Sequence, residues 1–284
     1  MGRHLERSLA VLNGAVGDYL ARTGNGLATP TTLVRDGVVT RRAPVDAGPR
    51  PVVLVHGLMG TEADWRAPSG ADLGAALARD LGLTPHYVRY NSGQAIVDSG
   101  RQLAALLEEV VDTYPVAVDE LVLIGHSLGG LVVRAACGVA RADGHRWLGH
   151  VRRAIYLGTP HRGAPLERVG RGVVRLLGVV PDPVTRLVGE IAAQRSVGIR
   201  DLGARAHPAP LLDGIAHHLI AGSLAGSRWL AALLGDGMVT VDSATDGRAG
   251  DDDRVVVVPG VGHVGLLRDP RVYALVRGWC EVTP

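Results

Sequence analysis

The sequence predicts an α/β domain in which a mostly parallel sheet carries helices on both faces and a helical cap insertion. Short uninterrupted runs of β-branched residues and leucine, such as residues 52–55 and 121–124, alternate with longer segments whose apolar residues recur at helical spacing. Strands that are apolar at every position are typical of a sheet with helices on both faces. With 284 residues the chain is long enough for one such domain with an insertion.

The first fifty residues are expected to form a helix and a loop-rich extension that pack on a body made by residues 51–284. Apolar side chains recur at helical spacing at Leu5, Leu9, Leu12, Val16 and Leu20. Glu6 and Asn13 interrupt this apolar stretch and no small-residue cleavage site follows, so we expect no signal peptide and a cytoplasmic protein. A strand pair is expected at residues 32–34 and 38–42, joined by an Asp-Gly turn.

Within the body, strands and helices are expected to alternate. The expected strands lie at residues 52–55, 86–90, 121–124, 153–157, 218–221 and 254–258. The expected helices lie at residues 71–81, 96–113, 128–140 and 270–281. Because helices join these strands, the sheet should be mostly parallel with right-handed crossovers.

The strand signal vanishes between about residues 163 and 205, where two apparent helices take its place. The first carries an apolar face that we expect to bind the substrate, made by Leu166, Val169, Val173 and Leu176. This segment is the predicted cap. An ordinary helical pair packed on the core is the alternative.

The composition argues against several classes of protein. The 30 basic and 28 acidic side chains give a formal net charge of +2, and the basic ones are scattered, so nucleic acid is not expected as a partner. The apolar runs are too short or too interrupted for a transmembrane segment. Cys137 and Cys280 are expected to be free thiols rather than a disulfide, and neither is expected to bind a metal.

The most informative motif is GHSLGG at residues 125–130, which follows an expected strand directly. A serine with glycines two residues to either side, between a strand and a helix, is typical of a nucleophile elbow. The elbow strains the backbone of the serine, and the glycines let strand and helix approach closely. We therefore expect Ser127 to be a nucleophile. A glycine-rich turn with an incidental serine is the alternative, so other signals must decide.

A serine hydroxyl is a poor nucleophile near neutral pH, so it needs a general base and a carboxylate that orients this base. His263 lies in a glycine-rich loop after the last expected strand, where open α/β sheets bind ligands, and is the expected base. Asp236, which lies between two glycines, is the expected acid, and Asp242 is the alternative. The acidic run at residues 251–253 is expected to be a solvated turn.

Acyl transfer also needs backbone donors for the oxyanion of the tetrahedral intermediate. One is expected to be the amide of Leu128, immediately after the nucleophile. The other should come from the His-Gly loop after the strand at residues 52–55, at the amide of Leu58, with Met59 as the alternative in a tighter turn. We expect His56 to be structural.

Five motifs together resemble the α/β-hydrolase superfamily, and within it the lipases and esterases related to bacterial triacylglycerol lipases and to inositol-deacylase-like hydrolases. They are VLVHGLMG, GHSLGG, LGTPHRG, GDGMVTVDSA and GVGH, and the likeness runs from about residue 51 to the C-terminus. The resemblance implies an α/β-hydrolase fold and favours ester or lipid substrates. It also places His161 and Arg162 at the border of the pocket, with a turn-stabilising role as the alternative.

These residues predict a serine carboxylester hydrolase, an esterase or lipase that acts through an acyl-enzyme on small-molecule esters or lipids with an apolar acyl chain. No cofactor and no metal are expected. An acyltransferase or a thioesterase would use the same residues, and a non-catalytic binding protein of this fold is a further alternative. Peptidase activity stays open, whereas dehalogenases and epoxide hydrolases are disfavoured because their nucleophile is an aspartate.

Overall fold

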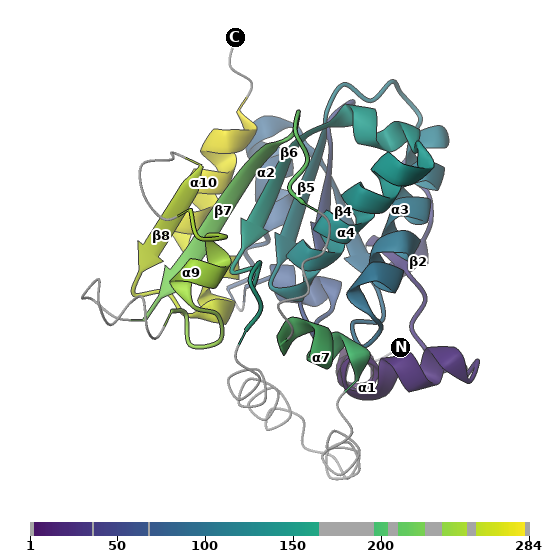
Figure 1. Cartoon of the computed structure of the whole chain (residues 1–284). Coiled ribbons are helices and arrows are strands. Elements are labelled where there is room, and N and C mark those ends of the chain that lie inside the picture. Colours follow the sequence, from purple (N-terminus) through teal and green to yellow (C-terminus); the bar gives the residue numbers. More distant parts are fainter. Residues whose placement is uncertain are drawn as a thin grey trace.

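A single sheet organises the part of the chain that the computed structural model describes, which is residues 3–35, 37–67, 69–164, 196–203, 210–224, 235–248 and 254–281. Within these ranges eight strands have the order β2-β1-β4-β3-β5-β6-β7-β8 (Figure 1). The strands are β1 (Thr32–Arg35), β2 (Val38–Thr40), β3 (Pro51–Val55), β4 (Thr84–Arg89), β5 (Leu121–His126), β6 (Val151–Leu157), β7 (Ala216–Ser223) and β8 (Val255–Pro259). The α-helices are α1 (Arg3–Arg22), α2 (Leu73–Leu81), α3 (Ile96–Asp112), α4 (Leu128–Asp143), α7 (Val197–Gly203), α9 (Val241–Ala244) and α10 (Pro270–Cys280). Short 3-10 helices are η1 (Glu62–Trp65), η2 (Arg146–His150) and η4 (His263–Leu267).

The sheet is mostly parallel, as predicted. Strands β3 to β8 pair in parallel with one another, whereas β1 is antiparallel to both β2 and β4. The chain adds β4 on one side of β3 and β5 on the other. The carboxyl ends of β3 and β5 therefore meet where the strand order reverses, which is where open α/β sheets bind ligands.

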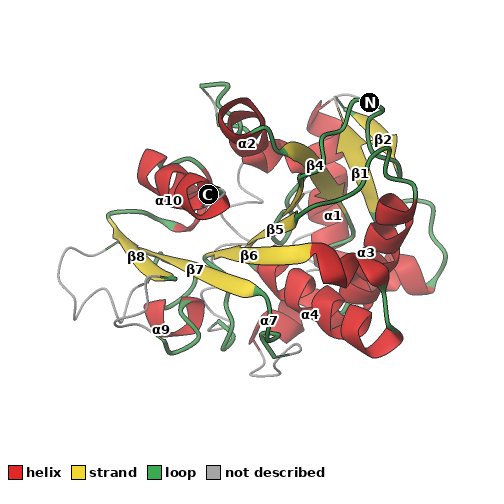
Figure 2. Cartoon of the chain, turned by 90° about the horizontal axis from the view of Figure 1, so that it is seen from above, coloured by secondary structure: helices red, strands yellow, loops and turns green. Residues whose placement is uncertain are grey.

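Helices bury both faces of the central strands. Along β3, Val53 and Val55 belong to the same core as residues of α3 and α4, whereas Val52 and Leu54 share a core with residues of α2 and α10. All four side chains are at most 1% exposed. Figure 2 shows α2 and α10 on one side of the sheet and α3 and α4 on the other. Alternate residues of β3 thus enter two different cores, which explains its uninterrupted apolar sequence.

The structure corrects several expected boundaries. β4 runs from Thr84 to Arg89 where a strand is expected at residues 86–90, and β2 ends at Thr40 rather than at residue 42. The sequence does not predict α9, a single turn in which the side chain of Thr240 accepts a hydrogen bond from the N–H of Ser243. Hydrophobic periodicity cannot reveal so short a helix.

Most of the predicted cap lies outside the described residues. The structure describes residues 163–164 and 196–203 of this segment, including α7. The hydroxyl of Ser196, just before α7, donates to the carbonyl of Gly14 in α1 at 2.7 Å. The predicted substrate-binding residues fall on the part that is not described, namely Leu166, Val169, Val173 and Leu176. The acidic run at residues 251–253 also lies outside the described ranges.

Helix α1 packs on the loops that follow β3 and β4. A Cβ atom added to Gly14 would overlap both the side chain and the backbone of Met59. The amide of Asn91 donates to the carbonyl of Gly17 at 2.8 Å. The first helix therefore contacts the carboxyl edge of the sheet directly.

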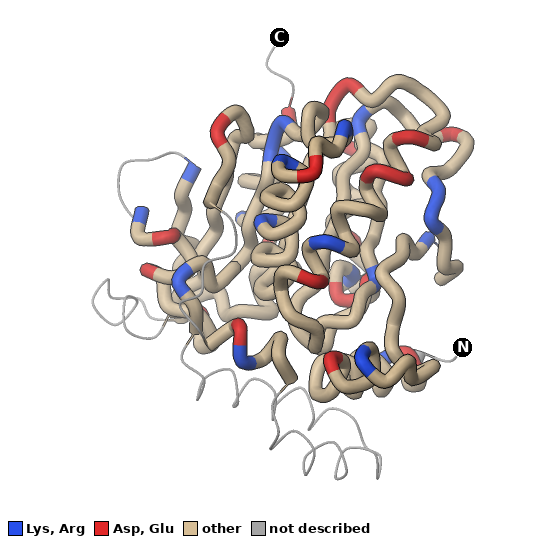
Figure 3. Tube along the Cα trace, turned by 45° about the vertical axis from the view of Figure 1, so that its right-hand side comes forward, with Lys and Arg blue, Asp and Glu red and all other residues tan. Residues whose placement is uncertain are grey.

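Charged residues of both signs lie on the outer elements of the described structure. In Figure 3, basic and acidic residues are interspersed over the outer elements without one continuous stripe of either sign. Of the helices in the described ranges, none combines the length and the hydropathy needed to cross a membrane. Cys137 and Cys280 are both buried free thiols, as predicted.

Candidate active site

Ser127 occupies a strained turn between β5 and α4. Its φ is 53° and its ψ is −125°, a backbone conformation that residues with a Cβ rarely adopt. Its N–H donates to the carbonyl of Leu157 at 2.9 Å, and its hydroxyl makes no capping bond to α4 although it occupies the capping position. The turn therefore fixes the backbone of Ser127 and leaves its hydroxyl uncommitted.

Two glycines make this turn possible by close backbone packing. A Cβ atom at Gly125 would overlap the backbone of Gly130, and one at Gly129 would overlap the carbonyl oxygen of Val55. Both obstacles are backbone atoms, which cannot move aside as a flexible side chain could. The spacing of glycines around Ser127 is thus required for the end of β5 and the start of α4 to approach β3.

His263 and Asp236 meet through a short hydrogen bond between loops that follow β8 and β7. His263 Nδ1 lies 2.6 Å from Asp236 Oδ2, and the residues are 6% and 4% exposed. The N–H of His263 also donates to the carbonyl of Asp236 at 3.0 Å. An ionised carboxylate can only accept, so the proton of this bond belongs to Nδ1. In the neutral imidazole, Nε2 is then an acceptor.

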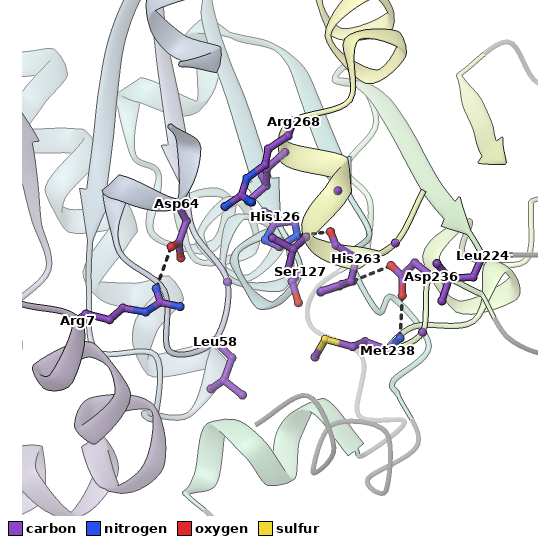
Figure 4. Close-up of a pocket in the computed structure, with 16 residues that line it drawn as sticks. Arg7, Leu58, Asp64, His126, Ser127, Leu224, Asp236, Met238, His263 and Arg268 are labelled. Atoms are coloured by element: carbon purple, nitrogen blue, oxygen red, sulfur yellow. Dashed lines mark hydrogen bonds and ion pairs between the residues drawn. The ribbon is translucent and has the colours of Figure 1, made fainter. Parts of the chain in front are cut away.

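The remaining ring nitrogen of His263 has no partner in the part of the chain that is described. Nε2 is buried and makes no hydrogen bond to any described residue. Ser127 and His263 line the same cavity, and in Figure 4 the hydroxyl of Ser127 lies beside the imidazole of His263. The cavity therefore contains a serine hydroxyl and a ring nitrogen without a partner among the described residues.

Asp236 is held as an anion in spite of its burial. Burial disfavours the charge, but the pKa of Asp236 is nevertheless lowered, because His263 attracts and bonds the carboxylate and the amides of Val239 and Met238 donate to it. The two amides reach Oδ1 at 2.8 and 2.9 Å. All the acceptor bonds of this carboxylate thus favour its ionised form.

The alternative acid, Asp242, lies in a different environment. Its side chain is 68% exposed and pairs with Arg162 at 3.3 Å. Arg162 is also 3.8 Å from the carboxylate of Asp246, and neither Arg162 nor His161 is among the residues that line the cavity. His161 is buried and bonds Arg134 at 2.7 Å. The contacts of His161 and Arg162 agree with a turn-stabilising role rather than a place at the pocket border.

The loop after β3 brings its backbone against Ser127. A Cβ atom added to Gly57 would lie 3.1 Å from the Cβ atom of Ser127. The N–H of Met59, whose φ is 56°, donates to the hydroxyl of Ser92 at 2.9 Å. The amide of Leu58, in contrast, bonds no acceptor among the described residues. Leu128 begins α4, so its N–H has no partner within the helix.

His126, the residue directly before Ser127, contacts His263. Its Nε2 donates to the carbonyl of His263 at 3.1 Å, and the two rings lie 4.9 Å apart. Burial, and next the nearby His263, lower the pKa of His126 to about 3, so it stays neutral. His56, expected to be structural, is likewise buried and stacks on Tyr90.

A cavity of about 560 Å³ opens over Ser127 and His263. Its apolar lining includes Leu58, Leu224 and Met238, and its polar lining includes three residues that the sequence analysis missed, namely Arg7, Asp64 and Arg268. Figure 4 shows these charged residues on the side away from Leu224. Arg7 belongs to α1, more than a hundred residues before the elbow, so no local pattern connects it with the site. Among the described residues no cluster of His, Cys, Asp or Glu could hold a metal ion.

Comparisons with known proteins place this arrangement in a known fold. A family model described as the PGAP1-like alpha/beta domain matches residues 46–177, a range that contains Leu58 and Ser127 but ends before Asp236 and His263. No curated protein matches the chain.

Solved structures of low sequence identity share the fold. The lipase BlEst2 of Bacillus licheniformis, in its mature form, is 21% identical with a TM-score of 0.54 over 84% of this chain and 96% of that chain. The NocB thioesterase domain, solved as a covalent complex with a fluorophosphonate nocardicin G analogue, is 20% identical with a TM-score of 0.53 over 84% and 97%. An alpha/beta hydrolase fold protein from Chitinophaga pinensis is 11% identical with a TM-score of 0.52 over 90% and 98%.

These findings confirm the predicted α/β-hydrolase fold and the resemblance to lipases and esterases of that superfamily. The neighbours also include a thioesterase domain. At these identities the likeness defines the fold, and the chemistry of this chain has to be argued from its own residues.

Proposed function

We propose that this protein is a serine carboxylester hydrolase in which Ser127 is the nucleophile, His263 the general base and Asp236 the acid that orients it. One observation carries the proposal. Nδ1 of His263 donates a hydrogen bond to a buried carboxylate, while its Nε2 is unpartnered among the described residues and shares a cavity with the hydroxyl of a strained elbow serine. His56 also has a ring nitrogen without a partner among the described residues, but only His263 of the two lines the cavity that contains Ser127.

In the proposed mechanism, Nε2 of His263 takes the proton of Ser127 as the hydroxyl attacks the ester carbonyl. Asp236 holds the imidazole in the required tautomer and stabilises the imidazolium that forms. The amides of Leu58 and Leu128 donate to the oxyanion, and each such donor is worth about 10²- to 10³-fold in rate where one has been removed. The alcohol leaves with the proton from His263, and water then cleaves the acyl-enzyme by the same route.

The apolar lining of the cavity supports an ester with an apolar portion. Leu58 and Leu224 offer carbon surface beside the charged residues of the site. We propose that the predicted cap face extends this surface with Leu166, Val169, Val173 and Leu176.

The central test is the hydrolysis of p-nitrophenyl esters by the wild-type protein and by Ser127→Ala. The variant should lose at least about 10⁴-fold in kcat, because it lacks the atom that forms the acyl-enzyme. Its free energy of unfolding should be close to that of the wild type or higher, because alanine fits the turn and no capping bond is lost. Turnover in Ser127→Ala close to that of the wild type would refute the assignment.

A thioesterase or an acyltransferase would use the same residues, and the likeness to the NocB thioesterase domain keeps the first of these open. Matched oxygen esters and thioesters of one acyl group separate an esterase from a thioesterase by their kcat/KM values. Adding a primary alcohol and measuring ester exchange against hydrolysis identifies an acyltransferase. A non-catalytic binding protein would turn over none of these substrates.

A further inference from the structure

Charged side chains line one part of the cavity, and they come from elements far apart in the chain. Arg7 belongs to α1, Asp64 to η1, and Arg268 follows η4, the turn that begins with His263. All three line the cavity that contains Ser127. In Figure 4 the guanidinium groups of Arg7 and Arg268 both extend toward the side of the cavity where Asp64 lies.

The carboxylate oxygens at this end already have donors. Asp64 accepts from Arg7 through Oδ1 at 2.8 Å and from the N–H of Thr61 through Oδ2 at 3.1 Å. Asp236, the other carboxylate that lines the cavity, is bonded to His263 and to two backbone amides. Each of these two carboxylates therefore already accepts hydrogen bonds through both of its oxygens.

Among the described residues that line the cavity, Arg268 is a cation without a counterpart. Its side chain is exposed at the cavity, and it forms no ion pair or side-chain hydrogen bond with any described residue. Arg7 pairs with Asp64 through a single nitrogen, Nη1, which leaves the other donors of its guanidinium available. Two guanidinium groups with free donors favour the binding of a carboxylate or a phosphate group, because their paired N–H groups match the oxygens of these anions.

We propose that the substrate of this site carries an anionic group, a carboxylate or a phosphate, that binds Arg268 beside Arg7 while its ester carbonyl lies at Ser127. The apolar remainder of the substrate then lies toward Leu224 and Met238. This inference rests on the proposed ester hydrolase function and names its substrate class. Arg268 acts as a specificity-determining residue and takes no part in the bond that is broken.

The test compares four esters of one design. Phenyl butyrate is neutral; 4-carboxyphenyl butyrate and 4-phosphooxyphenyl butyrate carry the anion on the alcohol; phenyl hydrogen glutarate carries it on the acyl group. The variant is Arg268→Gln, and Arg271→Gln is the matched control, because Arg271 pairs with Asp269 and does not line the cavity. Dividing each kcat/KM by that of phenyl butyrate removes any effect that is common to all four esters.

For at least one anionic ester this ratio should fall about tenfold in Arg268→Gln and remain unchanged in Arg271→Gln, since a charge-assisted hydrogen bond is lost only in the first. The wild-type ratio for that ester should also fall with added salt, because Arg268 is exposed. The ester affected identifies carboxylate or phosphate, and the acyl or the alcohol side. Equal loss for all four esters, or loss for none, would overturn the proposal.

Binding separates this inference from the proposed function. In a Ser127→Ala background, which cannot form the acyl-enzyme, the affinity for the preferred anionic ester is measured by calorimetry with and without Arg268→Gln. The added substitution should weaken binding of the anionic ester about tenfold and leave phenyl butyrate unaffected. If the wild type hydrolyses no ester, the proposed function fails; if the affinities do not respond to Arg268, the anion site fails.

Discussion

The turn around Ser127 and the turn around Asp236 each present one reactive side chain, but different contacts hold them. At the first, glycines pack against backbone atoms and the hydroxyl of Ser127 plays no part in holding the turn. At the second, the carboxylate of Asp236 itself accepts the N–H groups of Met238 and Val239. The nucleophile turn should therefore survive the loss of its reactive group, whereas the acid turn combines chemistry and local folding in one side chain.

After the loss of activity in Ser127→Ala, the largest expected effect tests the acid turn. Asp236→Asn can still accept from Met238 and Val239, but its amide offers a donor to His263 Nδ1, which then has to accept and leaves the proton on Nε2. This wrong tautomer should lower kcat about 10³- to 10⁴-fold. Steady-state kinetics on p-nitrophenyl esters measure the loss.

Asp242→Asn is the matched control for this prediction, because Asp242 is exposed and bonds Arg162 instead of the imidazole. Its kcat should stay within about twofold of the wild type, as is usual for exposed positions outside the site. A larger loss in Asp242→Asn than in Asp236→Asn would transfer the role of the acid to Asp242.

The next largest effect tests the packing of the nucleophile turn. Gly129→Ala adds a Cβ atom that overlaps the carbonyl oxygen of Val55, so the free energy of unfolding should fall by about 1–3 kcal/mol. Gly149→Ala adds the same atom in open space and should change stability little. Urea denaturation of both variants makes the comparison; equal stabilities would show that the turn tolerates side chains at its glycines.

A smaller effect on kcat is expected from the hydrogen bond that holds the loop after β3, which contains Leu58 and Met59. Ser92→Ala leaves the N–H of Met59 without its acceptor, so the neighbouring amide of Leu58 should lose its fixed position. We expect kcat to fall about threefold to tenfold with KM nearly unchanged, and stability to fall by about 1–3 kcal/mol for the buried unpaired N–H group. A change in KM alone would assign Ser92 to binding instead.

The smallest effect concerns His126 and the way in which the free energy of unfolding falls at low pH. The pKa of His126 is about 3 in the folded protein and 6.5 in its ordinary state, so the unfolded chain binds a proton that the folded protein excludes. The free energy of unfolding should therefore fall as the pH drops below about 6.5, by up to about 1.4 kcal/mol per pH unit for this group. Denaturation curves at several pH values should show a shallower slope in His126→Gln.

His86 provides the matched control for that prediction. Burial lowers its pKa to about 4, and it lies beside Tyr114, outside the lining of the cavity. His86→Gln should flatten the acid slope in the same way and leave kcat unchanged, whereas His126→Gln should lower kcat as well. Identical kinetics for the two variants would show that His126 does not support the base.

Local patterns were enough to predict the central strands and the elbow. β3 and β5 are buried on both faces, so their sequences are uninterrupted, and the glycine spacing around Ser127 follows from backbone contact. From the sequence, Asp236 could be expected only as one of two candidate acids, because Asp242 is close to it in the chain. The structure separates them, since Asp236 bonds His263 and Asp242 bonds Arg162.

Other features depend on contacts that no sequence window contains. Arg7 reaches the cavity because α1 packs on the loop at Met59, far along the chain. The antiparallel pairing of β1 with β4 joins residues that are far apart in the chain. The short helix α9 has one capping side chain and too few apolar residues to show a helical period. These are tertiary effects that hydrophobic periodicity does not encode.

Covalent labelling tests the central claim most directly. The protein is treated with a fluorophosphonate, and intact-mass and peptide mass spectrometry count and locate the adduct. We predict one adduct per chain, on Ser127, that is absent in Ser127→Ala and forms more slowly in Asp236→Asn. Labelling that persists in Ser127→Ala, or an adduct at another residue, would contradict the account.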